Sequence, residues 1–267
     1  MDTQTQADPQ TAELLKQSFE HLGRQDFVQC ERTLARILDA NPEQPDALEL
    51  LGTLHRMQGA QAEAESLYRR ALAVRPDHPQ THNFLGGLYR EMERLDEAIA
   101  ELQEAVRLKG NFADAWFELG LAQMAKGDLP AAEKSLRRAL HIVPNFLFAR
   151  QALGVLLNDM GQPREAETLL RQTLALGPRD PRHVAALEHN TGVALKLQGR
   201  YEEALRFFDA AQNRMPDVPM AEYNRGHTLQ LMGRREEAEA SFRRALAVNP
   251  QDEKAQNALD ELLATRH

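Results

Sequence analysis

The sequence has few cysteines, no long apolar runs and no excess of basic residues, and each of these features argues against a class of protein. It contains one cysteine, Cys30, which excludes an internal disulfide framework and a cysteine-based zinc site. No apolar run approaches the roughly 20 residues that cross a bilayer, so we expect no membrane insertion. Lys and Arg number 32 against 40 acidic residues, a formal charge of -8, which argues against a general nucleic-acid binder.

What the chain does contain favours soluble helical structure. It has 267 residues, of which 42% are hydrophobic, 27% charged and only 6% aromatic, and Ala, Leu, Glu and Arg are prominent. Residues Met1 to Glu13 are polar and acidic, unlike a signal peptide with its basic and apolar regions. We therefore expect a protein of a reducing, cytoplasmic compartment.

The dominant pattern is a repeated unit, visible as columns of similar residues that stay in phase along the chain. The interval is 34 residues, except for one step of 38 before Gly192. The glycine column reads Gly52, Gly86, Gly120, Gly154, Gly192 and Gly226; the small column Cys30, Ala64, Ala98, Ala132, Ala166, Ala204 and Ala238; the large column Leu34, Tyr68, Leu102, Leu136, Leu170, Phe208 and Phe242.

Each unit contains two helical patterns. Leu48, Leu51 and Leu54 recur at helical spacing, Gly59 interrupts them, and a second helical pattern runs to Pro76. We expect the small residues of both helices to let the two backbones approach closely. One such hairpin cannot bury its apolar face alone, so stability must come from stacking on its neighbours.

These residues resemble the tetratricopeptide repeat family, whose pattern is best matched by Trp116, Leu119, Gly120, Ala132, Leu136, Ala139 and Pro144. The resemblance implies an all-α fold, an α-solenoid in which antiparallel helix hairpins form a right-handed superhelix. The seven units predicted by this match are 11–44, 45–78, 79–112, 113–146, 147–180, 185–218 and 219–252.

Three segments lie outside the units. Residues 1–10 lack an apolar pattern and are expected to form a disordered tail. Residues 253–267 repeat a first helix without a second, which predicts a capping helix. The insertion 181–184 adds about one turn to the first helix of the sixth unit, with Asp180 as its N-cap.

No residue pattern predicts catalysis, a metal site or a cofactor. Cys30 occupies the small column and is expected to be a buried, inert thiol. His78 and His82 are separated by Pro79 at a unit boundary, so they do not share a helical face. The Arg pairs, such as Arg69-Arg70, lie near the ends of second helices. Cations there stabilise the negative end of the helix dipole, which explains these residues better than phosphate binding does.

The resemblance places the first helices on the inner wall of the solenoid, where the residues vary while the packing columns stay uniform. Aromatic side chains there could anchor a partner, and amides could grip a peptide backbone. The alternative for each aromatic is packing against the neighbouring unit. The candidate partner-binding residues are Asn83, Phe84, Arg90, Phe117, Glu118, Phe148, Gln151, Asn158, His189, Asn190, Tyr223, Asn224 and His227.

The sequence therefore predicts a non-enzymatic scaffold that binds a peptide or helix of a partner protein. Two alternatives stay open: a substrate-recruiting module of a glycosyl- or sulfotransferase, and a self-assembling scaffold, since homo-oligomers are possible. The family's carboxylate clamp for chaperone C-termini needs matched Lys, Asn and Arg residues, which the first units lack. The asparagine ladder of sugar-transferase arrays is matched only by Asn190 and Asn224.

Overall fold

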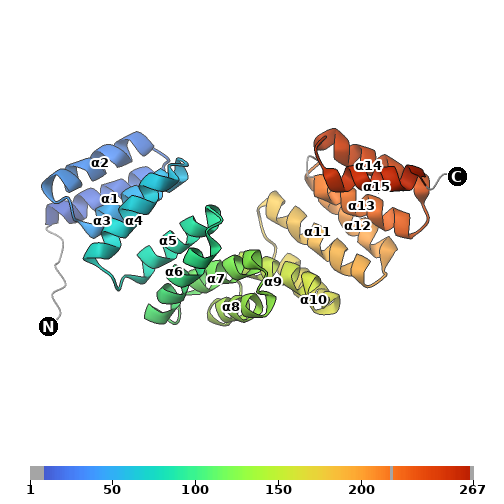
Figure 1. The fold of residues 1–267 in the computed structure, drawn as a ribbon, viewed down its shortest axis with the longest axis horizontal. Coiled ribbons are helices and arrows are strands. Elements are labelled where there is room, and N and C mark those ends of the chain that lie inside the picture. Colours follow the sequence, from blue (N-terminus) through green and yellow to red (C-terminus); the bar gives the residue numbers. More distant parts are fainter. Residues whose placement is uncertain (1–8, 217–218, 265–267) are drawn as a thin grey trace. The chain divides into compact units, whose positions relative to one another are not determined.

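The computed structural model describes residues 9–216 and 219–264, and for Pro219 and Met220 it describes the backbone alone. Within these ranges the chain forms fifteen α-helices that pack as sequential hairpins, the arrangement of a tetratricopeptide-like solenoid (Figure 1). The chain divides into two compact units, an N-terminal unit, Met1–Ile142, and a C-terminal unit, Val143–His267. Each unit is described by itself below.

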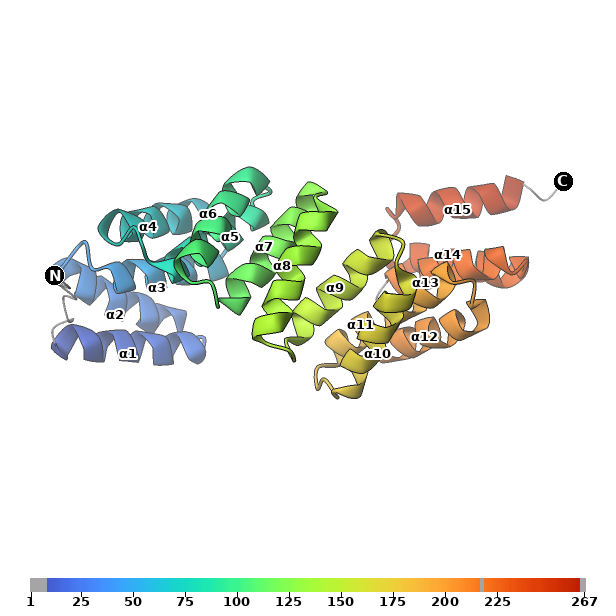
Figure 2. The same cartoon turned by 90° about the horizontal axis from the view of Figure 1, so that it is seen from below.

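The N-terminal unit consists of four helix hairpins, seen in blue to green in Figure 2. Its helices are α1 (Pro9–Gly23), α2 (Phe27–Ala40), α3 (Pro45–Met57), α4 (Gln61–Val74), α5 (Pro79–Glu91), α6 (Leu95–Leu108), α7 (Ala113–Lys126) and α8 (Leu129–Ile142). Pro9 and Gln10 were assigned to the tail from the sequence, but they form the first turn of α1. Residues 1–8 of that predicted tail lie outside the described residues.

The C-terminal unit consists of three hairpins and one single helix. Its helices are α9 (Leu147–Asp159), α10 (Pro163–Ala175), α11 (Pro181–Leu197), α12 (Tyr201–Arg214), α13 (Pro219–Leu231), α14 (Arg235–Val248) and α15 (Glu253–Ala264). In α15, Ala255, Leu259 and Leu262 are buried, and Glu253 and Lys254 are exposed, as a capping helix requires. Residues 265–267 of the predicted cap lie outside the described residues.

The inserted residues lengthen α11 as the sequence predicts. This helix has 17 residues, whereas α9 and α13, the first helices on either side of it, have 13 each. It begins at Pro181, and the Asp180 side chain caps it by accepting a hydrogen bond of 3.0 Å from the backbone N–H of Arg182. The extra turn brings Arg182 and His183 onto the start of α11.

In six of the seven hairpins, a large side chain of the second helix rests on a glycine of the first helix, and Ser18 takes the place of the glycine in the first hairpin. A Cβ built on Gly120 would lie 2.7 Å from Cγ of Leu136, and one on Gly192 would lie 2.6 Å from the Phe208 ring. The glycines thus mainly accommodate the large side chains of the second helices. The sequence predicts only that small residues let the two backbones approach closely. All residues of the small column, including Cys30, are fully buried.

First helices lie side by side within each unit. In the N-terminal unit α1, α3, α5 and α7 contact one another in series, and in the C-terminal unit α9, α11, α13 and α15 do the same. The second helices pack against first helices. We call the side of the first helices that is not packed against the second helices the first-helix face of each unit. None of the described helices is both long and apolar enough to cross a bilayer.

The glycine contact generates a stability prediction. Gly120→Ala should lower the free energy of unfolding by about 1–3 kcal/mol, because the new methyl group overlaps Leu136. Gly110→Ala is the control, since its Cβ would meet no atom closer than 3.9 Å and its φ is outside the left-handed region. Urea unfolding followed by circular dichroism measures both; equal stability of the two variants would contradict the packing argument.

Candidate functional site

The first-helix face of the N-terminal unit carries a series of ion pairs between neighbouring repeats. Arg56 on α3 donates to Glu91 at the end of α5, with Nε–Oε2 at 2.9 Å. Arg90 on α5 donates to Glu118 on α7 at the same distance. The candidates Arg90 and Glu118 therefore neutralise each other, and their charges already have partners inside the protein.

The aromatic candidates of the N-terminal unit are engaged in packing. Phe84 is half-buried and stacks on Tyr68, with ring centroids 5.9 Å apart. Phe117 is half-buried and also has a partner within the chain. Asn83 is buried, and its Oδ1 has no hydrogen-bond partner among the described residues. For Phe84 the alternative of packing between repeats therefore describes the structure.

Two aromatic side chains stand out from the first-helix faces. Phe148 on α9 and Phe19 on α1 are each 59% exposed. Phe148 touches the His183 ring edge-on, with centroids 4.9 Å apart, so the extra turn of α11 orients it. Phe19 was not among the predicted residues, although it occupies the same column as Val155 and His227, which the sequence placed on the inner wall.

The candidates of the C-terminal unit form a polar cluster on α11 and α13. Asn224 Nδ2 lies 3.1 Å from Nε2 of His189, and Asn224 Oδ1 accepts a hydrogen bond of 2.7 Å from Nζ of Lys196. Tyr223 stacks on His227 and leans on Phe242. Lys196 is not among the residues predicted to bind a partner, although it lies four residues after Gly192, as the predicted Arg90 lies four residues after Gly86.

Burial decides the charges in this cluster. Burial and, to a smaller extent, the nearby Lys196 ammonium lower the pKa of His189 to about 4, so the ring is neutral at pH 7. The pKa of His227 is lowered for the same two reasons, and its Nδ1 is buried without a partner among the described residues. Burial also lowers the pKa of Lys196 itself. A neutral His189 can accept the amide hydrogen of Asn224.

A second contact joins α9 to α11. Asn158 Nδ2 donates to the backbone carbonyl of Asn190 over 3.2 Å. Asn158 is buried and serves the packing of these two helices, whereas the Asn190 side chain is half-buried beside a cavity. Of the two amides, Asn190 is the one placed to meet a ligand.

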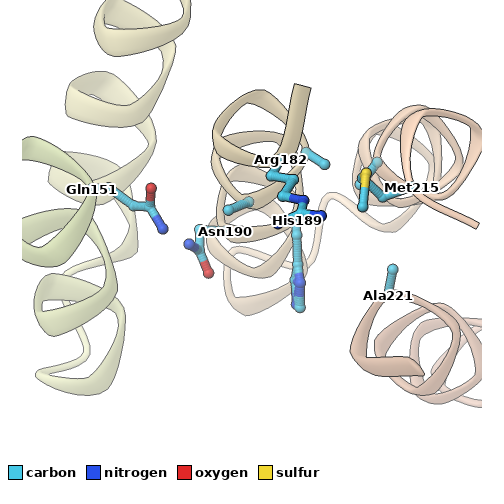
Figure 3. Close-up of a pocket in the computed structure, with 9 residues that line it drawn as sticks. Gln151, Arg182, His189, Asn190, Met215 and Ala221 are labelled. Atoms are coloured by element: carbon cyan, nitrogen blue, oxygen red, sulfur yellow. The ribbon is translucent and has the colours of Figure 1, made fainter. Parts of the chain in front are cut away.

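This cavity of about 380 Å³ lies against α11 in the C-terminal unit. In Figure 3, Arg182, His189 and Asn190 from α11 gather between Gln151 of α9 and the pair Met215 and Ala221. The lining is completed by Ala185, Ala186 and Ala211. Small apolar side chains form most of its wall, and Gln151, Arg182 and Asn190 provide polar groups, the composition expected of a recognition pocket.

The side chains considered for other chemistry are engaged elsewhere. Arg69, Arg137 and Arg243 form ion pairs with Glu residues four positions earlier on their own helices. Arg70 and Arg138 donate to backbone carbonyls, and Arg244 pairs with Glu222. Burial raises the pKa of the Cys30 thiol, which disfavours the thiolate. In the parts of the chain that the structure describes, no group of three potential metal ligands occurs.

The neutral His189 generates a pH prediction. Its pKa is about 4 in the folded protein and about 6.5 in an unfolded chain, so the unfolded state binds more protons between these values. The contribution of His189 to stability is complete above pH 6.5 and is lost as the pH falls towards 4. At pH 5 the loss should be about 2 kcal/mol.

The measurement compares the wild type with His189→Gln, which removes the titrating group and keeps an acceptor. The free energy of unfolding of the variant should fall less between pH 7.5 and pH 5, by about the 2 kcal/mol given above. The same pH slope for both proteins would show that His189 is accessible to protons in the folded state.

Comparison with known proteins agrees with the repeat geometry. Family models of the tetratricopeptide repeat match residues 20–79, 113–146, 147–217 and 219–252, and a model described as TPR repeat matches residues 86–127. A comparison with curated proteins finds no significant match.

Solved structures share the fold at low sequence identity. A tetratricopeptide repeat protein from Parabacteroides merdae is 19% identical, with a TM-score of 0.71 over 96% of this chain and 100% of its own. A chain of the APC/C hetero-tetramer Cut9-Hcn1 is 15% identical, with a TM-score of 0.76 over 95% of this chain. This chain spans 52% of that one. YrrB, described as having an unusual peptide-binding site, is 23% identical, with a TM-score of 0.56 over 72% of this chain and 97% of its own.

The matched family models together span most of the chain, from residue 20 to residue 252. The seven helix pairs and the final single helix, α15, follow the same 34-residue periodicity, lengthened once by the insertion in α11. Repeat arrays of this kind generally mediate protein–protein interactions. The chain belongs to the tetratricopeptide repeat family.

Proposed function

We propose that this chain is a non-enzymatic scaffold that holds an extended or helical segment of a partner protein against its first-helix faces. The observation that carries the proposal is the cavity beside α11, together with the exposed Phe148 on the adjacent α9. Phe148 and Gln151 are three residues apart on α9, so the aromatic ring and the cavity wall share one helix face.

The energetics favour a few anchors. Burying a Phe side chain such as Phe148 contributes about 1.5–3 kcal/mol, and an apolar side chain of the partner that enters the cavity contributes a similar amount. Such contacts resemble the hot spots that dominate protein interfaces. The peptide-binding site named for YrrB is consistent with this use of the fold.

The proposal is tested by quantitative affinity capture from the native lysate. The first-helix variant carries Phe19→Ala and Phe148→Ala, which remove one exposed ring from each unit. We expect the amount of partner protein captured by this variant to be at least about tenfold lower than with the wild type, because each ring contributes one buried anchor. Circular dichroism should show unchanged helicity, since neither ring is buried.

The matched control carries Val28→Ser and Val74→Ser on the second helices α2 and α4, where both side chains are exposed. It should capture the same protein as the wild type. Capture lost with this control and kept with the first-helix variant would move the binding surface to the second helices. A captured glycosyl- or sulfotransferase would favour the recruiting alternative, and a concentration-dependent sedimentation coefficient would favour self-assembly.

A further inference from the structure

A contact between equivalent positions of neighbouring first helices has different side chains in the two units. Arg90 on α5 donates to Glu118, 28 residues later on α7. Lys196 on α11 donates to Asn224, also 28 residues later, on α13. Both cations follow the packing glycine of their helix by four residues, so the two pairs occupy equivalent positions. The acid that neutralises Arg90 is thus replaced by a neutral amide opposite Lys196.

No carboxylate among the described residues neutralises Lys196. Glu188 on α11 and Glu222 on α13 are engaged elsewhere, since Glu188 pairs with Arg214 and Glu222 with Arg244. Lys196 is half-buried, and its charge adds to the effect of burial in lowering the pKa of both His189 and His227. Its ammonium has three donors, and the hydrogen bond to Asn224 uses one.

The cavity and Lys196 belong to one surface. His189 lines the cavity and touches the Asn224 amide, which accepts from Lys196. Arg182 lies on the cavity wall, is exposed, and forms no ion pair with the described residues. The cavity is therefore associated with two cations of α11 whose charges are uncompensated, while its own walls are mainly apolar.

We propose that this surface recognises an acidic segment of a partner protein, with a carboxylate bound by Lys196, whose ammonium Asn224 orients, and an adjoining apolar side chain in the cavity. The inference rests on the proposed scaffold function and specifies its partner. A partner carboxylate supplies the charge that Glu118 supplies to Arg90 in the N-terminal unit. It can accept the remaining ammonium hydrogens of Lys196, while Arg182 attracts further acidic residues.

A protein carboxylate fits better than the phosphates of a nucleic acid. Nucleic-acid binding uses several cations along a track, and the chain has a formal charge of -8. The arginine pairs of α4, α8 and α14 are occupied by glutamates and backbone carbonyls. Two cations beside one apolar cavity suit a short acidic and apolar sequence instead.

The experiment selects phage-displayed random 12-residue peptides on the full chain. The selected peptides should be enriched in Asp or Glu beside Leu or Met, and one of them is then synthesised and its Kd measured by fluorescence anisotropy. Lys196→Met should raise the Kd of this peptide by about tenfold or more, because the substitution removes the charged donor. The control is Lys134→Met on the exposed side of α8, which should leave the Kd unchanged.

Asn224→Glu provides a second variant that does not depend on removing the lysine. It places at residue 224 the acid found at the equivalent Glu118, so an internal ion pair should form and the peptide should bind about tenfold more weakly or worse. Nuclear magnetic resonance of the Lys196 side chain should show its pKa rising in this variant. A pKa of Lys196 above the value of about 10.4 for an exposed lysine, together with weaker binding, would not follow from misfolding, because misfolding only removes the lowering by burial.

The outcomes separate this inference from the proposed function. Selected peptides without acidic enrichment, or a Kd unchanged by Lys196→Met and Asn224→Glu, would overturn the carboxylate site and leave the scaffold function standing. Failure of the wild type to select any peptide above the background of the bare support would contradict both. Selection of acidic peptides that depends on Lys196 supports both.

Discussion

The fold depends on the contact between a glycine of the first helix and a large apolar side chain of the second helix, which is present in every hairpin after the first. Six such pairs recur, from Gly52 with Tyr68 to Gly226 with Phe242, and in each a Cβ on the glycine would come within 3 Å of the partner side chain. The contact sets the distance between the two helices of a hairpin. Because every hairpin has nearly the same spacing, neighbouring hairpins can stack in register and bury the apolar faces that none could bury alone.

Regular stacking also brings equivalent positions of successive repeats into contact, and this decides which polar groups remain available. In two repeats, a cation four positions after the packing glycine donates to a residue 28 positions later on the next first helix. Where the two are Arg90 and Glu118, the pair closes the surface electrostatically. Where they are Lys196 and Asn224, the amide orients the ammonium and supplies no opposing charge. The difference in partner binding that we propose between the units therefore depends on one side-chain type at a repeated contact.

The repeated unit, its two helices, the capping helix and the extra turn of α11 could be predicted from the sequence, because glycine, proline and apolar spacing act within a hairpin of 34 residues. The candidate site was harder to predict. The helical spacing predicts both Phe84 and Phe148 as binding residues, whereas Phe84 stacks on Tyr68 and Phe148 is 59% exposed. Spacing places Lys196 on the same helix stripe as His189, but only its neighbours in the structure show that an amide, and no carboxylate, faces its charge.

The sequence by itself determined that this chain is an array of tetratricopeptide repeats, since each column encodes a local contact between two helices that follow one another. The tertiary structure decided which side chains of the first helices are used by the next repeat and which are left to bind. Those contacts join residues about 28 to 35 positions apart, and their geometry depends on how the hairpins stack. The cavity beside α11 is likewise a product of stacking, because its walls come from four helices.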